Sequence, residues 1–524
     1  MRGITLGVAL CWAIGSGGCG SLTPTGPQPL PNPWADAHPP KRTVAKVPNV
    51  LLVVWDTTRA DRLSMYGHDA PTTPRMESFF RDGLVFNNAV SPSYWTLPSH
   101  VSLFTGLPSS SHGAHAGRQW LDDRFVTLAE HLGTNGFDTY AWSSNPNIHP
   151  SKNTHQGFQA LNHPFGGSAW AEAVEEWSKT LVRPDDYSTS PNPNRWKSVT
   201  HHKHGPVANK AFGQWLDGRA DKNKPFFGFI NYMEAHAYRL PTEESRRAIS
   251  PDAQRYQKAL KTSQSLGRMT NVMYGRWRGW NRNEREALFD VYDASVRDLD
   301  KWTGELVDDL ARRGVLDDTL VIVTSDHGEQ LGEHRLWLHN FSLYETLVHV
   351  PLAIRYPAVV KPGRVDFPVS GTSIFATVVD AAGLPWPDQP IEPHSLVSPS
   401  PYTVVSDFDV ACGHPENRRL DTTIRDWSAT YTAVFSESWK YIEASNDLNE
   451  LFNLATDPKE LDNVTLTNSE QTEKMADTLA AWRKGQPKME ASEAVVEAEE
   501  KTRLANKDDK IMEELEELGY VNEE

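Results

Sequence analysis

Acidic and histidine side chains stand at the ends of two apolar runs of the sequence, where they could bind a divalent metal. Asp56 closes an apolar run that begins at Val50. Asp326 and His327 follow a second run, Leu320–Thr324. Adjacent Asp and His side chains offer an oxygen and a nitrogen ligand from one tight turn, which suits a divalent transition metal. A charge at a strand end is also common in a solvated turn, and the Asp–His pair is what favours the metal.

A third apolar run carries a similar motif. Glu234 and His236 come soon after the run Phe226–Tyr232. All three runs are short and largely apolar, which is typical of strands that helices cover on both faces of a mainly parallel sheet. Ligands of such sheets gather at the carboxyl ends of the strands, and this is where Asp56 and Asp326 are expected.

Helices are predicted between these strands. The clearest one spans Asn283–Arg313, where Leu299 and Trp302 belong to an apolar series at helical spacing before Gly314. A shorter helix is predicted over Phe125–Gly133. The alternation of strands and helices predicts an α/β fold with a doubly wound, mainly parallel sheet.

Changes in composition and in hydrophobic pattern divide residues 49–524 into three parts. A catalytic domain is expected over residues 49–364. Shorter strands and turns predict a smaller C-terminal α+β subdomain over residues 365–488, in which 438–442 and 450–454 form a hairpin pair. Residues 489–524 are rich in Glu, Ala, Lys and Leu and predict a helical tail.

The composition argues against a nucleic-acid-binding protein. The chain has 524 residues with 39% hydrophobic residues and 18 Trp, which is ample for a large core. Its formal net charge is −16, whereas neutralising the phosphates of a nucleic acid requires a basic face. A small anionic substrate is still compatible with this charge, because a buried metal can reverse the local field.

The N-terminal segment predicts export. Arg2 precedes the apolar run Ile4–Ile14, which is too short to cross a bilayer and is typical of a signal peptide over residues 1–18. Cys19 follows Gly-Gly and resembles the acylated cysteine of a bacterial lipobox, although Ser16 stands where Leu is usual. We expect a lipid-anchored protein of the cell envelope, on the periplasmic or outer-surface side. An ordinary cleaved signal with an incidental cysteine is the alternative.

A proline-rich tether over residues 19–48 is expected to join this anchor to the folded part. Cleavage of the signal peptide would remove Cys11 and leave Cys19 and Cys412. We therefore expect no intrachain disulfide framework.

Several further motifs follow one another along the chain in a set order. They are Asp56, Arg59, Asp61, Thr96–Gly106, Ser325–Glu329, Gly332, Glu333, His334, His339, Tyr344, Glu345, Val350–Leu352, Lys440–Ile442 and Glu450–Glu460. In this order they resemble the motifs of the sulfatase family, in the alkaline phosphatase superfamily. The resemblance covers roughly residues 49–464 and implies a metal-dependent hydrolase of sulfate or phosphate esters.

The resemblance also assigns the metal site. It implies that Asp56, Asp326 and His327 bind one divalent metal, with the Thr96 oxygen as the ligand at the open position and as the nucleophile. The nitrogen of His327 favours zinc or manganese, and calcium or magnesium is the alternative.

Four histidines are candidates for contact with the substrate. By resemblance, His236 and His339 hold the ester oxyanion or protonate the leaving group. His100 and His334 either assist them or are structural. The expected partners are a small-molecule, glycan or lipid ester as substrate and a membrane through the lipid anchor, with no nucleic acid.

The sequence departs from the family at the nucleophile and at the anion-binding positions. Many sulfatases oxidise a Cys or Ser to formylglycine, but oxidation of Thr96 would give a ketone, because its β-carbon carries a methyl group. His100 replaces an Arg, Thr57 replaces an Asp, and residues 141–145 lack the family's Gly-Lys-x-His. A threonine alkoxide resembles the nucleophiles of superfamily phosphotransferases and phosphodiesterases, so the nucleophile favours phosphorus. The alternatives are a phosphotransferase acting on a cell-envelope substrate and a non-catalytic binding module, and the retained metal set favours a catalyst.

Overall fold

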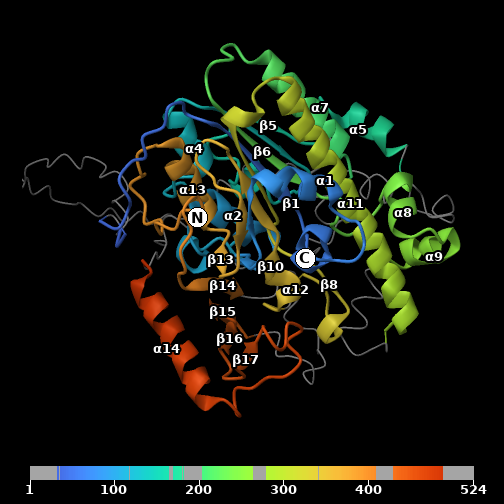
Figure 1. Ribbon diagram of the computed structural model, residues 1–524, viewed down its shortest axis with the longest axis vertical. Coiled ribbons are helices and arrows are strands. Elements are labelled where there is room, and N and C mark those ends of the chain that lie inside the picture. Colours follow the sequence, from blue (N-terminus) through green and yellow to red (C-terminus); the bar gives the residue numbers. More distant parts are fainter. Residues whose placement is uncertain are drawn as a thin grey trace, which may run out of the picture.

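The described part of the protein is built on one large central sheet (Figure 1). The computed structural model describes residues 32–34, 36–116, 118–164, 169–179, 181, 203–263, 279–339, 342–408 and 429–487. The sheet has eight strands in the order β12-β2-β11-β7-β1-β6-β4-β5. Their bounds are β1 Asn49–Trp55, β2 Leu84–Phe86, β4 Asp138–Ser143, β5 Ala160–Asn162, β6 Phe226–Tyr232, β7 Thr319–Thr324, β11 Leu352–Arg355 and β12 Gly363–Val365.

Most pairs of neighbouring strands in this sheet are parallel. β1 pairs in parallel with both β6 and β7, and β4 pairs in parallel with β5 and β6. β11 is antiparallel to both of its neighbours, β7 and β2. The three apolar runs of the sequence are therefore β6, β1 and β7, side by side in the middle of the sheet. This arrangement confirms the predicted α/β class with a mainly parallel sheet.

Helices cover both faces of the sheet, because the side chains of β1 alternate between two apolar layers. Leu51 and Val53 lie in the layer formed with α7 and α11, and Leu52 and Val54 lie in the layer formed with α4 and α13. Figure 1 shows these two groups of helices on opposite sides of the sheet. The helices are α1 Pro74–Phe79, α2 Thr96–Thr105, α3 Ser109–His112, α4 Leu128–Thr134, α5 Ala171–Ser178, α7 Gly205–Gly218, α8 Glu243–Ile249, α9 Ala253–Ser263, α11 Arg282–Arg312, α12 Glu345–Val348, α13 Ser373–Ala382 and α14 Ser469–Gly485.

Capping explains where the predicted helices begin. The helix predicted over Phe125–Gly133 is α4, which begins after Thr127 because the Thr127 hydroxyl accepts a hydrogen bond from Glu130 N–H at 3.1 Å. The Glu130 carboxylate accepts in return from Thr127 N–H at 2.8 Å, which completes a capping box. The helix predicted over Asn283–Arg313 is α11, and its bounds differ by one residue at each end.

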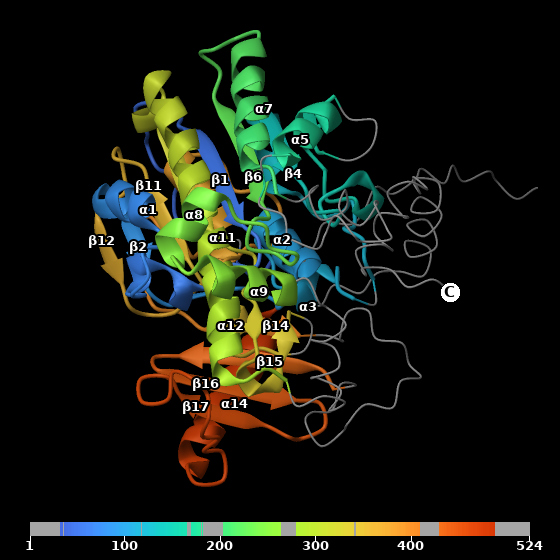
Figure 2. The same ribbon diagram turned by 90° about the vertical axis from the view of Figure 1, so that its right-hand side faces the viewer.

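A second, antiparallel sheet lies at the lower end of the molecule in Figures 1 and 2. Its strands are β14 Val404–Phe408, β15 Tyr431–Ser436, β16 Trp439–Ala444 and β17 Glu450–Asn453, in this order, and α14 packs on it. β16 and β17 form the predicted hairpin pair. The predicted subdomain boundary at residue 365 lies before α13. This helix packs on the main sheet through its apolar face, and the small sheet begins only at Val404.

Several predicted segments fall outside the described residues. They are the signal peptide 1–18, most of the tether 19–48 and the tail 489–524, and Cys19 and Cys412 lie outside as well. Within the described ranges, no helix combines the length and the apolar composition that crossing a membrane requires.

Candidate active site

The predicted metal ligands converge at the carboxyl ends of two neighbouring strands. Asp56 follows β1, and Asp326 and His327 follow β7, its partner in the sheet. One ligand atom from each of these side chains lies within 4.8 Å of the others, and the three residues are fully buried. The pairing of β1 with β7 therefore brings together residues that are far apart in the sequence.

The turn after β1 is strained and is held from two sides. Thr57 has a φ of 59°, which is uncommon for a β-branched residue. Its N–H donates to Asp326 Oδ1 at 3.2 Å, and its carbonyl accepts a hydrogen bond from the Tyr292 hydroxyl at 2.6 Å. The turn that carries Asp56 is thus fixed against both the Asp326 turn and helix α11.

The electrostatics of this cluster fit a divalent cation. Asp56 Oδ1 and Asp326 Oδ2 are buried without a hydrogen-bond partner in the described structure. Burial raises the pKa of each acid to about 7, and for Asp56 the Asp326 carboxylate adds to this effect. Burial lowers the pKa of His327 to about 4, so its imidazole is neutral. Buried carboxylates with unpaired oxygens and a neutral imidazole form a suitable donor set for a divalent metal.

Thr96, the predicted nucleophile, begins helix α2 beside this cluster. Its Oγ1 lies 3.4 Å from His327 Nε2, and the residue is fully buried. Because α2 has 10 residues and Thr96 is in its first turn, the hydroxyl lies at the positive end of the helix dipole, which favours an alkoxide. The structure therefore brings together Thr96 and the three candidate metal ligands.

Two asparagines that the sequence prediction missed form hydrogen bonds to Thr96 or Asp56. The Asn145 amide donates to Thr96 Oγ1 at 3.2 Å and to Asp56 Oδ2 at 2.8 Å. Asn231 donates to the same Asp56 oxygen at 3.4 Å. Asn231 is in β6 and Asn145 follows β4, so their place at the carboxyl ends of strands is the signal that could have found them.

His236 and His339 lie next to the metal cluster. The His339 ring centroid is 4.6 Å from that of His327 and 5.2 Å from that of His236. His339 Nδ1 lies 3.1 Å from Glu329 Oε1, and Arg239 donates to Glu329 Oε2 at 2.5 Å. Burial alone would lower the pKa of His339, but the Glu329 carboxylate reverses this and raises it. A protonated His339 can donate a hydrogen bond or a proton to a bound ester.

A buried lysine supports the turn that carries His236. Lys203 Nζ donates to the His236 carbonyl at 2.7 Å and also to the Met233 carbonyl. Burial raises the pKa of Glu234 to about 7, and the charge of Lys203 opposes this shift. Glu234 also accepts a hydrogen bond from Gly205 N–H at 2.8 Å. Lys203 is a further residue that the sequence prediction missed, because only the tertiary fold shows that it is buried.

The other two predicted histidines have different surroundings. His100 is fully buried, and its Nδ1 lies 2.9 Å from the Thr96 carbonyl oxygen. The same nitrogen is 3.4 Å from Asp326 Oδ2, but that oxygen accepts no hydrogen bond from it. His100 thus contacts the backbone of Thr96 and supports the start of α2. His334 stacks on Tyr344 at 3.8 Å, in a cleft that none of the four predicted metal-site residues lines.

Comparison with known proteins places this site in a family. The family named Sulfatase matches residues 48–384, which contain all the strands of the main sheet and the metal cluster. The chain therefore belongs to the sulfatase family of the alkaline phosphatase superfamily and is an ester-hydrolysing enzyme. This confirms the resemblance that the motifs indicated.

Individual relatives have different substrates in their names. The chain is 26% identical to human arylsulfatase K over 459 residues, or 82% of this chain and 81% of the relative. It is 33% identical to choline-sulfatase of Rhizobium meliloti (strain 1021) over 189 residues, or 35% of this chain and 33% of the relative. The fold is similar to that of a phosphonate monoester hydrolase of Agrobacterium radiobacter, with a TM-score of 0.65, 22% identity and coverage of 83% of this chain and 95% of that chain.

Proposed function

We propose that the enzyme cleaves a singly charged sulfate or phosphorus ester with the Thr96 hydroxyl as nucleophile. The observation that carries this proposal is the position of Thr96 Oγ1, 3.4 Å from His327 Nε2 and 3.2 Å from the Asn145 amide. A divalent cation held by Asp56, Asp326 and His327 would lower the pKa of this hydroxyl and offset charge on the ester. The geometry supports a hydroxyl that reacts as an alkoxide.

The residues around Thr96 have separate roles in the proposed reaction. The hydroxyl loses its proton to water, and its oxygen forms a bond to the sulfur or phosphorus as the bond to the leaving oxygen breaks. His339 gives a proton to the leaving oxygen, and Glu329 favours the protonated form of His339 by raising its pKa. The Asn145 amide and the start of α2 stabilise the negative oxygen of Thr96. Water then cleaves the bond to Thr96 and restores the hydroxyl.

The charge of the site supports a singly charged ester group. Asn145 is a neutral donor beside the nucleophile. Burial lowers the pKa of His100 to about 3, so this residue, which stands where the family has an Arg, is neutral too. Because few cations lie near the reacting oxygen, the site gives little electrostatic stabilisation to a doubly charged phosphate monoester. A singly charged sulfate ester, phosphodiester or phosphonate monoester needs less of it. Among these esters, the threonine nucleophile favours phosphorus, because a threonine sulfate would need a second attack at sulfur.

Turnover of an ester panel tests both parts of the proposal. Aryl sulfate, phosphomonoester, phosphodiester and phosphonate monoester substrates are given to the wild-type enzyme and to Thr96→Ala, and the metal content of each protein is measured. We expect Thr96→Ala to keep its metal and to lose turnover by about 10⁴-fold or more, as is usual when a nucleophile is removed. Full activity of Thr96→Ala would exclude Thr96 as the nucleophile. Fast cleavage of the phosphomonoester alone would refute the preference for a singly charged ester.

A further inference from the structure

A buried series of polar contacts leads from the turn after β6 to His339. Arg239 follows the turn that carries His236, and its guanidinium donates from Nε to the Ala235 carbonyl at 2.7 Å. The same guanidinium donates to Glu329 Oε2, and the other oxygen of that carboxylate lies 3.1 Å from His339 Nδ1. Arg239 is 2% exposed and Glu329 is 1% exposed, so these contacts are shielded from water. One guanidinium therefore links the two segments that carry His236 and His339.

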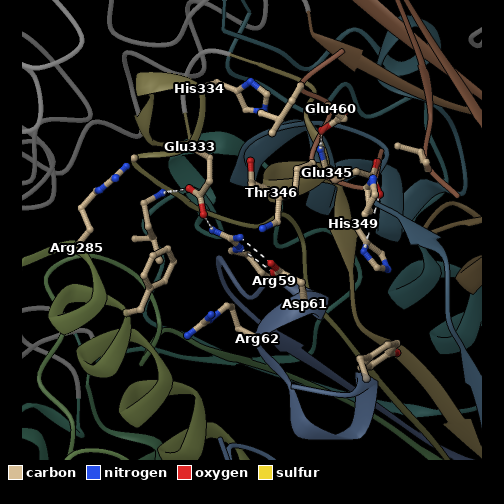
Figure 3. A pocket seen from close by; sticks show the side chains of 18 of the residues that line it. Arg59, Asp61, Arg62, Arg285, Glu333, His334, Glu345, Thr346, His349 and Glu460 are labelled. Carbon is tan, nitrogen blue, oxygen red and sulfur yellow. Dashed lines mark hydrogen bonds and ion pairs between the residues drawn. The ribbon is translucent and has the colours of Figure 1, made fainter. Parts of the chain in front are cut away.

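The backbone of Glu329 is held separately, by Arg59. The Arg59 guanidinium donates to the Glu329 carbonyl at 3.1 Å and to the Glu333 carboxylate at 2.8 Å. Figure 3 shows Arg59 in contact with Asp61 and Glu333, in a cleft of about 910 Å³. Arg59 thus fixes the course of the main chain at Glu329, and it leaves the direction of the Glu329 carboxylate to Arg239.

The contact with Glu329 decides which ring nitrogen of His339 can meet a substrate. Nδ1 is engaged by Glu329, which leaves Nε2 as the nitrogen for a bound ester. The ring centroid lies 4.6 Å from that of His327 and 5.2 Å from that of His236, so the ring is at the edge of the metal cluster. A carboxylate that contacts one imidazole nitrogen orients the ring and thereby directs the other nitrogen. The direction of the Glu329 carboxylate therefore sets the direction of Nε2.

Stability alone is a weak reason for this buried ion pair. Desolvating an arginine and a carboxylate together is costly, and apolar side chains of similar volume often stabilise a fold equally well. Another buried cation, Lys440, contacts Glu345 and Glu460 at 2.9 and 2.7 Å. Neither of those acids contacts His339 within the described part of the chain. The ion pair at the metal site thus has a third member, a histidine of the site, that the other group lacks.

We propose that Arg239 is a positioning residue, which holds the Glu329 carboxylate so that Nε2 of His339 faces the leaving oxygen of the ester. The inference rests on the proposed function, in which His339 protonates that oxygen. The proton passes from Nε2 to the oxygen as its bond to sulfur or phosphorus breaks. The neutral ring then takes a proton from the water that cleaves the bond to Thr96. Arg239 acts through Glu329 and takes no part in these bond changes.

The dependence of kcat on the leaving group separates this role from a general loss of stability. The metal-loaded wild type, Arg239→Gln and Arg239→Lys are given the 4-nitrophenyl and phenyl esters of methylphosphonate and of sulfate. 4-Nitrophenolate leaves readily without a proton, whereas phenolate needs one. We expect Arg239→Gln to lower kcat by about 100-fold for the phenyl ester and by less than about tenfold for the 4-nitrophenyl ester, with a smaller change in KM. Arg239→Lys reaches only one of the two acceptors, so it should show a smaller loss of the same kind, and it serves as the test if Arg239→Gln does not fold.

Arg219→Gln is the matched control. The Arg219 side chain is 6% exposed and donates to Asp138 at 2.9 Å, but Asp138 begins β4, at the end of the strands opposite the metal cluster. This variant loses a similarly buried pair, so it should lower the urea midpoint while the ratio of the two kcat values stays that of the wild type. A purely structural role of Arg239 predicts the same unchanged ratio for Arg239→Gln, and that result would overturn the inference.

Crystal structures of the metal-loaded wild type and of Arg239→Gln give a second test that needs no turnover. We expect the His339 ring of the variant to lose its contact with Glu329 or to turn away from its wild-type direction. An unchanged contact and ring direction would also overturn the inference. If the wild type cleaves none of the esters, the proposed function fails, and the two crystal structures alone decide whether Arg239 positions His339.

Discussion

Replacing Lys203 by methionine should lower both the stability and the activity of the enzyme. Lys203 Nζ holds the carbonyls of Met233 and His236, so the substitution releases the turn that carries His236. It also leaves Glu234 as an uncompensated buried acid, because Glu234 is 4% exposed. Each lost hydrogen bond from the charged amine costs about 1.5–3 kcal/mol of the free energy of unfolding, and the unbalanced charge of Glu234 adds to this cost. Misplacing a group at a reaction centre by about 1 Å can cost about 100-fold in rate.

A double variant distinguishes positioning from simple destabilisation. Lys203→Met with Glu234→Gln removes both charges, so urea unfolding should show part of the lost stability restored. The two carbonyls still lack their donor, so we expect kcat to remain about 10- to 100-fold below that of the wild type, with a smaller change in KM. Lys203→Arg, which keeps a cationic donor, should recover part of kcat. A stable double variant with the kcat of the wild type would refute the positioning role of Lys203.

Three other substitutions test separate parts of the structure. Thr96→Ser should keep part of the turnover, because the hydroxyl survives and only a methyl group is lost, and an inactive but metal-loaded Thr96→Ser would contradict this. Lys440→Met should lower the free energy of unfolding by about 3–5 kcal/mol. Burial raises the pKa of Glu460 to about 7 even with Lys440 present, so without Lys440 its ionisation destabilises the folded protein further. The loss of unfolding free energy should therefore be larger near about pH 8 than near about pH 5. Urea midpoints that do not change with pH would be inconsistent with this. We also propose that Cys19 is lipidated, so Cys19→Ser should move the protein from the membrane fraction to the soluble one, and unchanged fractionation would remove this proposal.

The fold could be predicted where one physical effect dominates the local sequence. β1, β6 and β7 are buried on both faces, so their sequences are unbroken apolar runs that need no knowledge of the neighbours. Helix α11 is predictable from the sequence because the apolar residues of the face that packs on the sheet repeat at helical spacing. The predicted metal residues Asp56, Asp326 and His327 come directly after β1 and β7. They can be predicted to lie together because the carboxyl ends of parallel strands meet at one edge of the sheet.

The residues that were missed are polar side chains whose role depends on the tertiary fold. Asn145 follows β4, whose sequence contains Asp138, Thr139 and Ser143, so the strand is not an apolar run. Lys203 resembles any surface lysine in the sequence, and its burial follows from the packing of the His236 turn. The boundary at residue 365 preceded α13 because composition changes there, whereas packing with the main sheet continues beyond it.

The pairing of β1 with β7 also has a consequence for folding. Contacts between segments far apart in the chain form slowly, because a long loop must close before they form. Asp56 is held by β6 and Asn145, whereas the other proposed ligands, Asp326 and His327, join it only when β7 has been added. A nascent chain that ends before Thr319 therefore lacks two of the three proposed metal ligands, so we expect metal to contribute little to early folding intermediates. Bound metal should instead slow the unfolding of the folded protein, because it would link the carboxyl ends of β1 and β7.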